Sequence, residues 1–233
     1  NVTKYVVNLS QGGTTLSARD HYLKDDPQSV RIRNAYHTYM VTLFKLTGST
    51  EAIAEQKAKT VFNLEKAFAE MQMSRIEMRD PYKTYNKLTV AEFNKITPAI
   101  DWNSYLPKFK INGQDTVLVN SLSFFKSLNG MLTSVPMADW RTYLEWNILK
   151  GSAGNLSSPF VNASFAFTQA QTGQKVQTPR WQTMSSLTDR TIGELLGQLY
   201  VAKYFKPDAK VRMDVMIENL RKAFEIRING LEW

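Results

Sequence analysis

The sequence predicts a mainly α protein, a multi-helix lobe with two or three short β-strands. Apolar residues recur at spacings of three and four over most of the chain, and Asp-Pro, Ser-Pro and Gly signals bound these stretches. Runs typical of strands are few and short. With 233 residues and 43% hydrophobic content, the chain can bury a substantial core as one large domain or two closely packed subdomains.

The composition excludes several classes of protein. Without cysteine there is no disulfide, no thiolate nucleophile and no sulfur-ligated zinc site. No apolar run approaches the ~20 residues that span a bilayer, and the first residues lack the pattern of a signal peptide. The net charge of +8 could attract nucleic acid, an anionic surface or acidic peptides, but it is spread too evenly to choose among them.

The first predicted element is a short strand at residues 5–9, closed by Gly12 and Gly13. No neighbouring run in the sequence offers it a partner, so we expect that partner to lie outside the chain.

Two helices that form a hairpin are predicted next. Asp26 can cap the first and Pro27 can occupy its first turn, and its apolar face is Ile32, Tyr36, Tyr39, Leu43 and Leu46, up to Gly48. The second begins near Thr50, and its apolar face is Ala54, Ala58, Val61, Leu64, Phe68 and Met71. Glu55 and Lys59 are predicted to pair on its outer face.

A shaped corner follows at residues 79–89. Proline after Asp80 disfavours helical geometry there, and the aspartate can bond the backbone ahead of it. Thr89 and Glu92 then form a predicted capping box that opens a short helix at 90–96, which Pro98 stops.

The remaining elements are one helical turn, one hairpin and five helices. Residues 101–106 read as the turn, and Asn112-Gly113 predicts a tight hairpin between residues 109–111 and 117–119. The helices are expected at 122–132, 136–150, 159–170 with Ser158 as cap, 182–205 and 207–228. In the helix at 182–205, the spacing of Gly193 and Gly197 would allow a neighbouring helix to approach, and Tyr200 and the preceding Trp181 would supply large buried surfaces.

No group of side chains in this sequence predicts chemistry. His21 and His37 are the only histidines, and neither has a second nitrogen ligand at the spacing that binds zinc. We expect a structural loop role for His21, and we interpret His37 as a polar residue on a tyrosine-rich helix. Asp25 and Asp26 precede proline, so capping explains them better than acid–base catalysis.

Five ordered segments resemble one known family. They are Ala-Arg-Asp-His-Tyr-Leu at 18–23, the corner at 79–89, Pro-Arg-Trp at 179–181, Gly-Glu-Leu-Leu-Gly-Gln-Leu-Tyr-Val at 193–201 and Leu-Glu-Trp at 231–233. Together they resemble the helical N-terminal lobe of the neprilysin and endothelin-converting-enzyme family of zinc metalloendopeptidases, from about Val6 to Trp233. Animal members carry a cysteine shortly after the arginine–tryptophan pair, whereas this chain has Met184 in that segment, which favours a bacterial member.

The resemblance implies a two-lobed parent protein that cleaves small peptides. In this family the catalytic lobe holds zinc through His-Glu-x-x-His and a downstream glutamate, and the helical lobe covers a cavity that admits peptides but not folded proteins. No such motif occurs here. Residues 1–233 would thus be a fragment that binds no zinc, with no catalytic, cofactor-binding or metal-binding residue.

The implied partners are a peptide substrate and the catalytic lobe of the same chain, and the implied location is periplasmic, cell-surface or secreted. Both termini would lead to the missing lobe, so we expect Asn1 and Trp233 on one side of the domain, near exposed apolar surface.

Two other classes of function remain open. One is a stand-alone helical protein that binds peptides or serves as a scaffold. The other is a basic nucleic-acid binder, which is weakly supported. Its basic residues occur in pairs two positions apart, and on a helix the two members of each pair would lie on different faces: Arg31/Arg33, Lys57/Lys59 and Lys108/Lys110.

Overall fold

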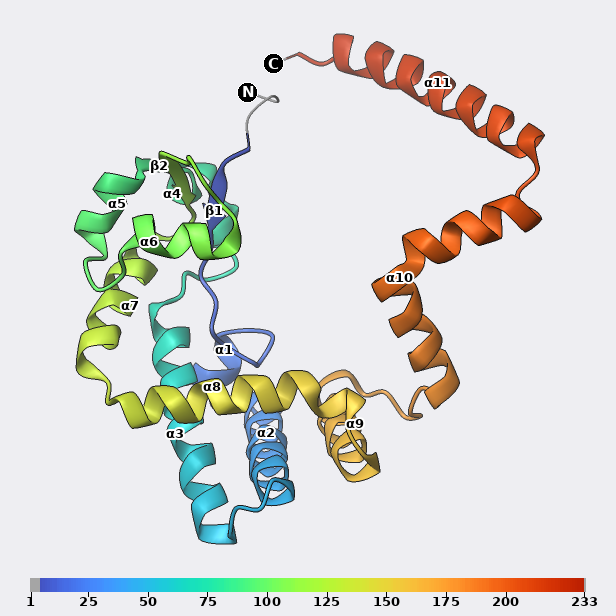
Figure 1. Ribbon diagram of the computed structural model, residues 1–233. Helices are drawn as coiled ribbons and strands as arrows, with labels where there is room; N and C mark the ends of the chain where they lie inside the picture. The colour runs from blue at the N-terminus through green and yellow to red at the C-terminus, as the bar shows by residue number, and fades with distance from the viewer. Residues whose placement is uncertain (1–4, 233) are drawn as a thin grey trace. The chain divides into compact units, whose positions relative to one another are not determined.

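The computed structural model describes residues 5–232 and divides the chain into two units, residues 1–175 and 176–233. The first unit contains a helical part and a part built on a small sheet (Figure 1). The second contains two long helices. The mainly helical fold predicted from the sequence is confirmed. The placement predicted for Asn1 and Trp233 concerns residues outside the described range.

Five helices build the helical part of the first unit. They are α1 (Asp20–Leu23), α2 (Pro27–Leu46), α3 (Glu51–Met71), α8 (Met137–Ser152) and α9 (Ser158–Thr172), with a 3-10 turn η3 (Ala153–Asn155). The predicted hairpin of α2 and α3 is confirmed. Asp26 caps α2, since its carboxylate accepts from the backbone N–H of Ser29 at 3.0 Å. The N-cap of α9 is Ser157 rather than the predicted Ser158.

Trp146 of α8 is the centre of the helical core. Its indole is fully buried, and the rings of Tyr36, Tyr39 and Phe44 lie 5.4–5.9 Å from it. Phe167 of α9 stacks on Tyr39 at 4.9 Å. Because aromatic pairs in these geometries add to the free energy gained by burial, this cluster fixes α2, α8 and α9 to one another.

The sheet part contains the remaining elements of the first unit. They are β1 (Val7–Leu9), η1 (Glu77–Arg79), α4 (Pro81–Thr84), β2 (Asn86–Thr89), α5 (Val90–Ile96), α6 (Trp102–Tyr105), η2 (Leu106–Phe109), β3 (Thr116–Val119) and α7 (Leu122–Ser134). The capping box of Thr89 and Glu92 is present as predicted. The sheet lies at the end of the first unit that is away from the turn between α2 and α3 (Figure 1).

The sheet corrects two predictions about strand pairing. Its order is β1-β3-β2, with β1 parallel to β3 and β2 antiparallel to β3. The strand at residues 5–9 therefore finds its partner within the chain, more than a hundred residues later. A parallel pair needs a long crossover, so no nearby run could reveal it.

The predicted hairpin around Asn112-Gly113 is wrong. Residues 106–109 form a 3-10 turn instead of a strand, and Lys110 ends it in the left-handed conformation with φ 61°. Gly113 has φ 69°, so the glycine marks a turn as expected. The strand after that turn is β3. It pairs with β1 and β2, and the apolar faces of all three strands cover one core.

A second core lies under the sheet. Phe93 is fully buried, and the rings of Trp102 and Phe125 lie 5.0 and 5.4 Å from it. The indole N–H of Trp102 donates to the hydroxyl of Thr97 at 2.8 Å, which satisfies a polar atom in this apolar setting. Phe68 of α3 belongs to this core, whereas Ala58 and Val61 of the same helix belong to the helical core. Helix α3 therefore connects the two cores.

The second unit contains α10 (Arg180–Tyr204) and α11 (Pro207–Asn229). Helix α10 departs from helical geometry at Ile192, directly before Gly193. No residue of either helix is buried among those that the structure describes. The predicted burial of Trp181 and Tyr200 is therefore wrong for this chain, as they are 71% and 59% exposed, and a Cβ on Gly197 would contact nothing within 4 Å.

We expect Gly13→Ala to destabilise the protein more than Gly48→Ala. Both glycines have positive φ, 89° and 96°, so each substitution incurs backbone strain. Only at Gly13 would the new Cβ lie 2.9 Å from the ring of buried Phe68, whereas that of Gly48 meets nothing within 4 Å. Overpacking should add about 1–3 kcal/mol to the loss at Gly13, measured by urea unfolding. Equal losses would show that the Phe68 ring moves aside freely.

Candidate functional site

Residues 5–232 offer no set of zinc ligands. No three side chains of histidine, aspartate or glutamate come together there in a way that could hold a metal ion. His37 Nε2 lies 2.9 Å from Glu55 Oε2 on the surface, and His21 Nδ1 lies 3.3 Å from the hydroxyl of Ser29. Zinc sites need three or four converging ligands, so these residues do not fit a zinc centre. Glu55 is thereby paired with His37 rather than with Lys59 as predicted.

The polar cluster at the centre of the first unit is built around Glu65. Its carboxylate lies on α3, is fully buried and accepts three hydrogen bonds from hydroxyl groups. Thr15 donates at 2.6 Å, Tyr22 at 2.6 Å and Tyr36 at 2.8 Å. A buried carboxylate must be hydrogen-bonded to be tolerated, and this one is.

The donors around Glu65 come from segments far apart in the sequence. Lys150 of α8 donates to the hydroxyl of Thr15 at 2.8 Å, and the indole N–H of Trp146 approaches the same oxygen at 3.4 Å. The hydroxyl of Tyr22 in turn accepts from the backbone N–H groups of Thr15 and Leu16. The Glu65 cluster, which we define as Thr15, Tyr22, Tyr36, Glu65 and Lys150, thus joins the N-terminal segment to four helices.

The electrostatics of this cluster follow from burial. Desolvation and then the neighbouring Glu65 charge raise the pKa values of the Tyr22 and Tyr36 phenols above their ordinary value. Desolvation lowers the pKa of Lys150, and the Glu65 charge opposes that shift. For Tyr143, burial first and Glu65 second raise the pKa to about 12. Each buried phenol is therefore held in its protonated form, in which it can donate.

These contacts give the cluster a structural role. The carboxylate is closed off from solvent and all its contacts are internal, so it holds the N-terminal segment against α3 and α8. Sequence reasoning missed it, although a signal existed. Glu65 follows Val61 by four residues and Ala58 by seven, which places a charge on the buried face of a predicted amphipathic helix.

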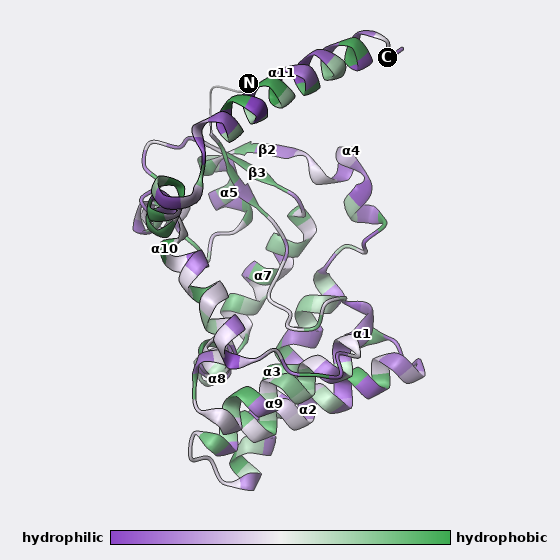
Figure 2. Cartoon of the chain, turned by 90° about the vertical axis from the view of Figure 1, so that its right-hand side faces the viewer, coloured by the Kyte–Doolittle hydropathy of each residue, from purple (hydrophilic) through white to green (hydrophobic). Residues whose placement is uncertain are grey.

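Helices α10 and α11 display long apolar faces. The face predicted for α10, residues 192, 195, 196, 199 and 200, is 45–70% exposed, and Phe224 of α11 is 70% exposed. Figure 2 shows apolar residues interspersed with polar ones along α11. A groove of about 630 Å³ on α11 is lined by Ile217, Leu220, Phe224 and Ile228 among others. Exposed apolar surface on this scale is typical of an interface with another part of a protein.

The whole chain matches a family of peptidases. The model of the N-terminal part of Peptidase family M13 matches residues 1–233. The chain belongs to this family and corresponds to its N-terminal domain, as the five sequence segments predicted.

Individual relatives agree with this assignment. The chain is 27% identical to endothelin-converting enzyme 1 of Bos taurus and to endothelin-converting enzyme-like 1 of Mus musculus, with all of the chain aligned. Among solved structures it is similar to the zinc metalloprotease ZMP1 of Mycobacterium tuberculosis in its open state, with a TM-score of 0.83 and 26% identity over 99% of the chain.

The chain spans about a third of these relatives, 32% of the bovine enzyme and 36% of the mycobacterial one. In residues 5–232 no helix is long and apolar enough to cross a membrane. The predicted bacterial origin and the predicted location outside the cytoplasm stay predictions.

Replacing Glu65 by leucine should destabilise the protein by about 3–5 kcal/mol, because three hydroxyl donors lose their acceptor and Lys150 loses its counter-charge. The matched control is Glu55→Leu on the same helix, where the exposed pair with His37 should contribute no more than about 1 kcal/mol. Urea unfolding measures both. Similar losses for the two variants would show that the hydroxyl groups find other partners.

Stability should fall as the pH rises above 10.0, the ordinary pKa of tyrosine. The unfolded chain then releases protons that folded Tyr22 and Tyr36 retain, so each phenol contributes a loss of about 1.4 kcal/mol per pH unit. Lys150 acts in the opposite direction just below its ordinary pKa of 10.5, because the unfolded chain binds that proton more tightly.

The slope is measured by urea unfolding at successive pH values. Tyr22→Phe should reduce the slope of stability against pH by about 1.4 kcal/mol per pH unit, because it removes a single titrating phenol. An unchanged slope in Tyr22→Phe would contradict the assignment.

Proposed function

We propose that this chain is part of the covering lobe of a zinc-dependent endopeptidase that cleaves small peptides. The lobe forms part of the wall of the substrate cavity and restricts the size of substrates, and the chain itself performs no chemistry. Zinc belongs to the catalytic lobe of the parent protein. The observation that carries the proposal is the match of residues 1–233 to the N-terminal domain of Peptidase family M13.

Two features of the described residues support this role. No set of side chains among them is arranged to hold a metal ion, and the proposal assigns zinc to the catalytic lobe. The apolar faces of α10 and α11 are exposed in a chain that spans only about a third of its relatives. Such faces lose water contact favourably, and in this proposal the rest of the parent chain covers them.

The partners in this proposal are a peptide substrate and the catalytic lobe of the same chain, and nucleic acid is not among them. A covering lobe excludes water from the reaction and sorts substrates by access rather than by bond making. The parent protein would act in the periplasm, at the cell surface or in the secreted fraction.

The exposed face of α10 gives a direct test in the full-length protein. Leu199 is 70% exposed in this chain, so Leu199→Asp would be nearly neutral if α10 stayed in water. If the parent chain covers α10, the variant buries a charge and should lose about 3 kcal/mol or more. Gln198→Asp, one residue away on the polar side of the helix, is the matched control.

Thermal unfolding of the full-length protein measures both variants. Equal small effects would favour the stand-alone binding or scaffolding protein over the covering lobe.

Activity tests the parent enzyme separately. The full-length protein should cleave a short peptide, lose this activity on removal of zinc and regain it on addition of zinc, and leave the same sequence uncut inside a folded protein. Cleavage of both substrates at similar rates would contradict the size restriction. Retention on DNA that decreases steeply with salt would instead support the nucleic-acid binder.

A further inference from the structure

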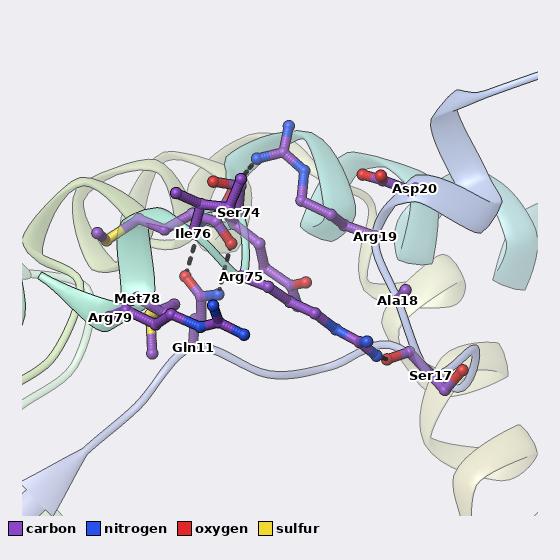
Figure 3. A pocket seen from close by; sticks show the side chains of 12 residues that line it. Gln11, Ser17, Ala18, Arg19, Asp20, Ser74, Arg75, Ile76, Met78 and Arg79 are labelled. Carbon is purple, nitrogen blue, oxygen red and sulfur yellow. Dashed lines mark hydrogen bonds between the residues drawn. The ribbon is translucent and has the colours of Figure 1, made fainter.

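A pocket of about 570 Å³ lies where the N-terminal segment meets the segment that follows α3 (Figure 3). One wall is residues 17–20 together with Gln11, and the other is residues 72–76 with Met78 and Arg79. Three arginines, Arg19, Arg75 and Arg79, line it. We call it the arginine pocket. It lies outside the Glu65 cluster.

Two of the arginines connect the two walls by hydrogen bonds, and each has further N–H donors. The guanidinium of Arg19 donates to the backbone carbonyl of Gln72, and that of Arg75 donates to the carbonyl of Ser17 at 3.0 Å. A guanidinium has five N–H donors. In the part of the chain that the structure describes, these two bonds are the side-chain hydrogen bonds of Arg19 and Arg75, so most of their N–H donors have no partner within the protein.

Arg79 makes no such structural contact. Its side chain extends from η1, and within residues 5–232 it has neither a hydrogen bond nor an ion pair. The pocket is also lined by Gln11, whose side chain ends in an amide, and Figure 3 labels both residues. That amide is already occupied, since it donates to the carbonyl of Met73 at 3.0 Å and accepts from the N–H of the same residue at 2.8 Å. Arg79 is therefore a cation without a counter-ion on the pocket wall.

The acidic side chains nearby are engaged elsewhere. Asp20 lines the pocket, but its carboxylate pairs with Lys24 at 2.7 Å. Glu77 lies in the same segment as Arg79, and its carboxylate accepts from the N–H and the hydroxyl of Ser74 at 2.8 and 2.7 Å. The lining therefore carries a net positive charge, because it contains three guanidinium groups and one carboxylate.

We propose that the arginine pocket binds an oxyanion, a carboxylate or phosphate group, held by Arg79 with the spare donors of Arg19 and Arg75. Guanidinium groups are weakly hydrated and present forked donors that match the oxygens of such groups. The wall bonds of Arg19 and Arg75 fix their positions before the anion arrives, which limits the entropy lost on binding. The oxyanion is either a diffusible anion or a side-chain carboxylate from another part of the parent chain.

The test compares Arg79→Gln with Arg31→Gln in the full-length protein. Arg31 is an exposed arginine of α2 outside the pocket, so it controls for the loss of one positive charge. Thermal unfolding is recorded while inorganic phosphate or glutarate is added at constant ionic strength. Arg79→Lys serves as a third variant, because it keeps the charge but loses the fork.

A diffusible oxyanion should raise the melting temperature of the wild type and of Arg31→Gln in a saturable way. In Arg79→Gln the apparent affinity should fall at least about tenfold, because charge-assisted hydrogen bonds are lost, and Arg79→Lys should lie between them.

If a carboxylate of the parent chain already occupies the pocket, added phosphate or glutarate should not change the melting temperature. Arg79→Gln alone should then lower the melting temperature relative to Arg31→Gln, and the difference should shrink as sodium chloride is added. The proposal is overturned if Arg79→Gln matches Arg31→Gln in both measurements, or if its destabilisation is independent of salt.

Discussion

The buried carboxylate of Glu65 is the interaction on which the first unit depends. It lies at the meeting point of the N-terminal segment and helices α1, α2, α3 and α8, and it accepts hydrogen bonds from hydroxyl groups of three of those segments. Removing such a group from water is unfavourable unless every partner is in place. The cluster therefore forms only when the surrounding segments are assembled together, which favours one arrangement of the helices over others.

Two further features extend this arrangement to the sheet. Helix α3 contributes to both cores, and Tyr143 of α8 packs against both. The hydroxyl of Tyr143 donates to the carbonyl of Gly13 at 2.8 Å, so the segment between β1 and α1 is fixed at Gly13 as well as at Thr15. The walls of the arginine pocket belong to the same segment and to the stretch after α3. The Glu65 cluster thereby anchors one of the two segments that line the arginine pocket.

Local signals in the sequence predicted local structure well. The cap at Asp26, the capping box at Thr89 and Glu92 and nearly every long helix depend on bonds between residues a few positions apart, and the structure contains them. The candidate sites were harder to predict from the sequence. Glu65 gave one signal, a charge on an apolar face, but its partners Thr15, Tyr22 and Lys150 are brought together only by folding. The pairing of β1 with β3 was missed for the same reason.

The sequence by itself determined the helical class, the positions of the helices and the family, because periodicity, caps and motifs depend on residues that are close together in the sequence. Only the tertiary structure decided which apolar faces are covered. The patterns of α2 and α10 look alike, yet Tyr36 is fully buried and Leu199 is 70% exposed. An amphipathic pattern records that a face avoids water, whereas the surface that covers it depends on contacts between distant parts of the chain.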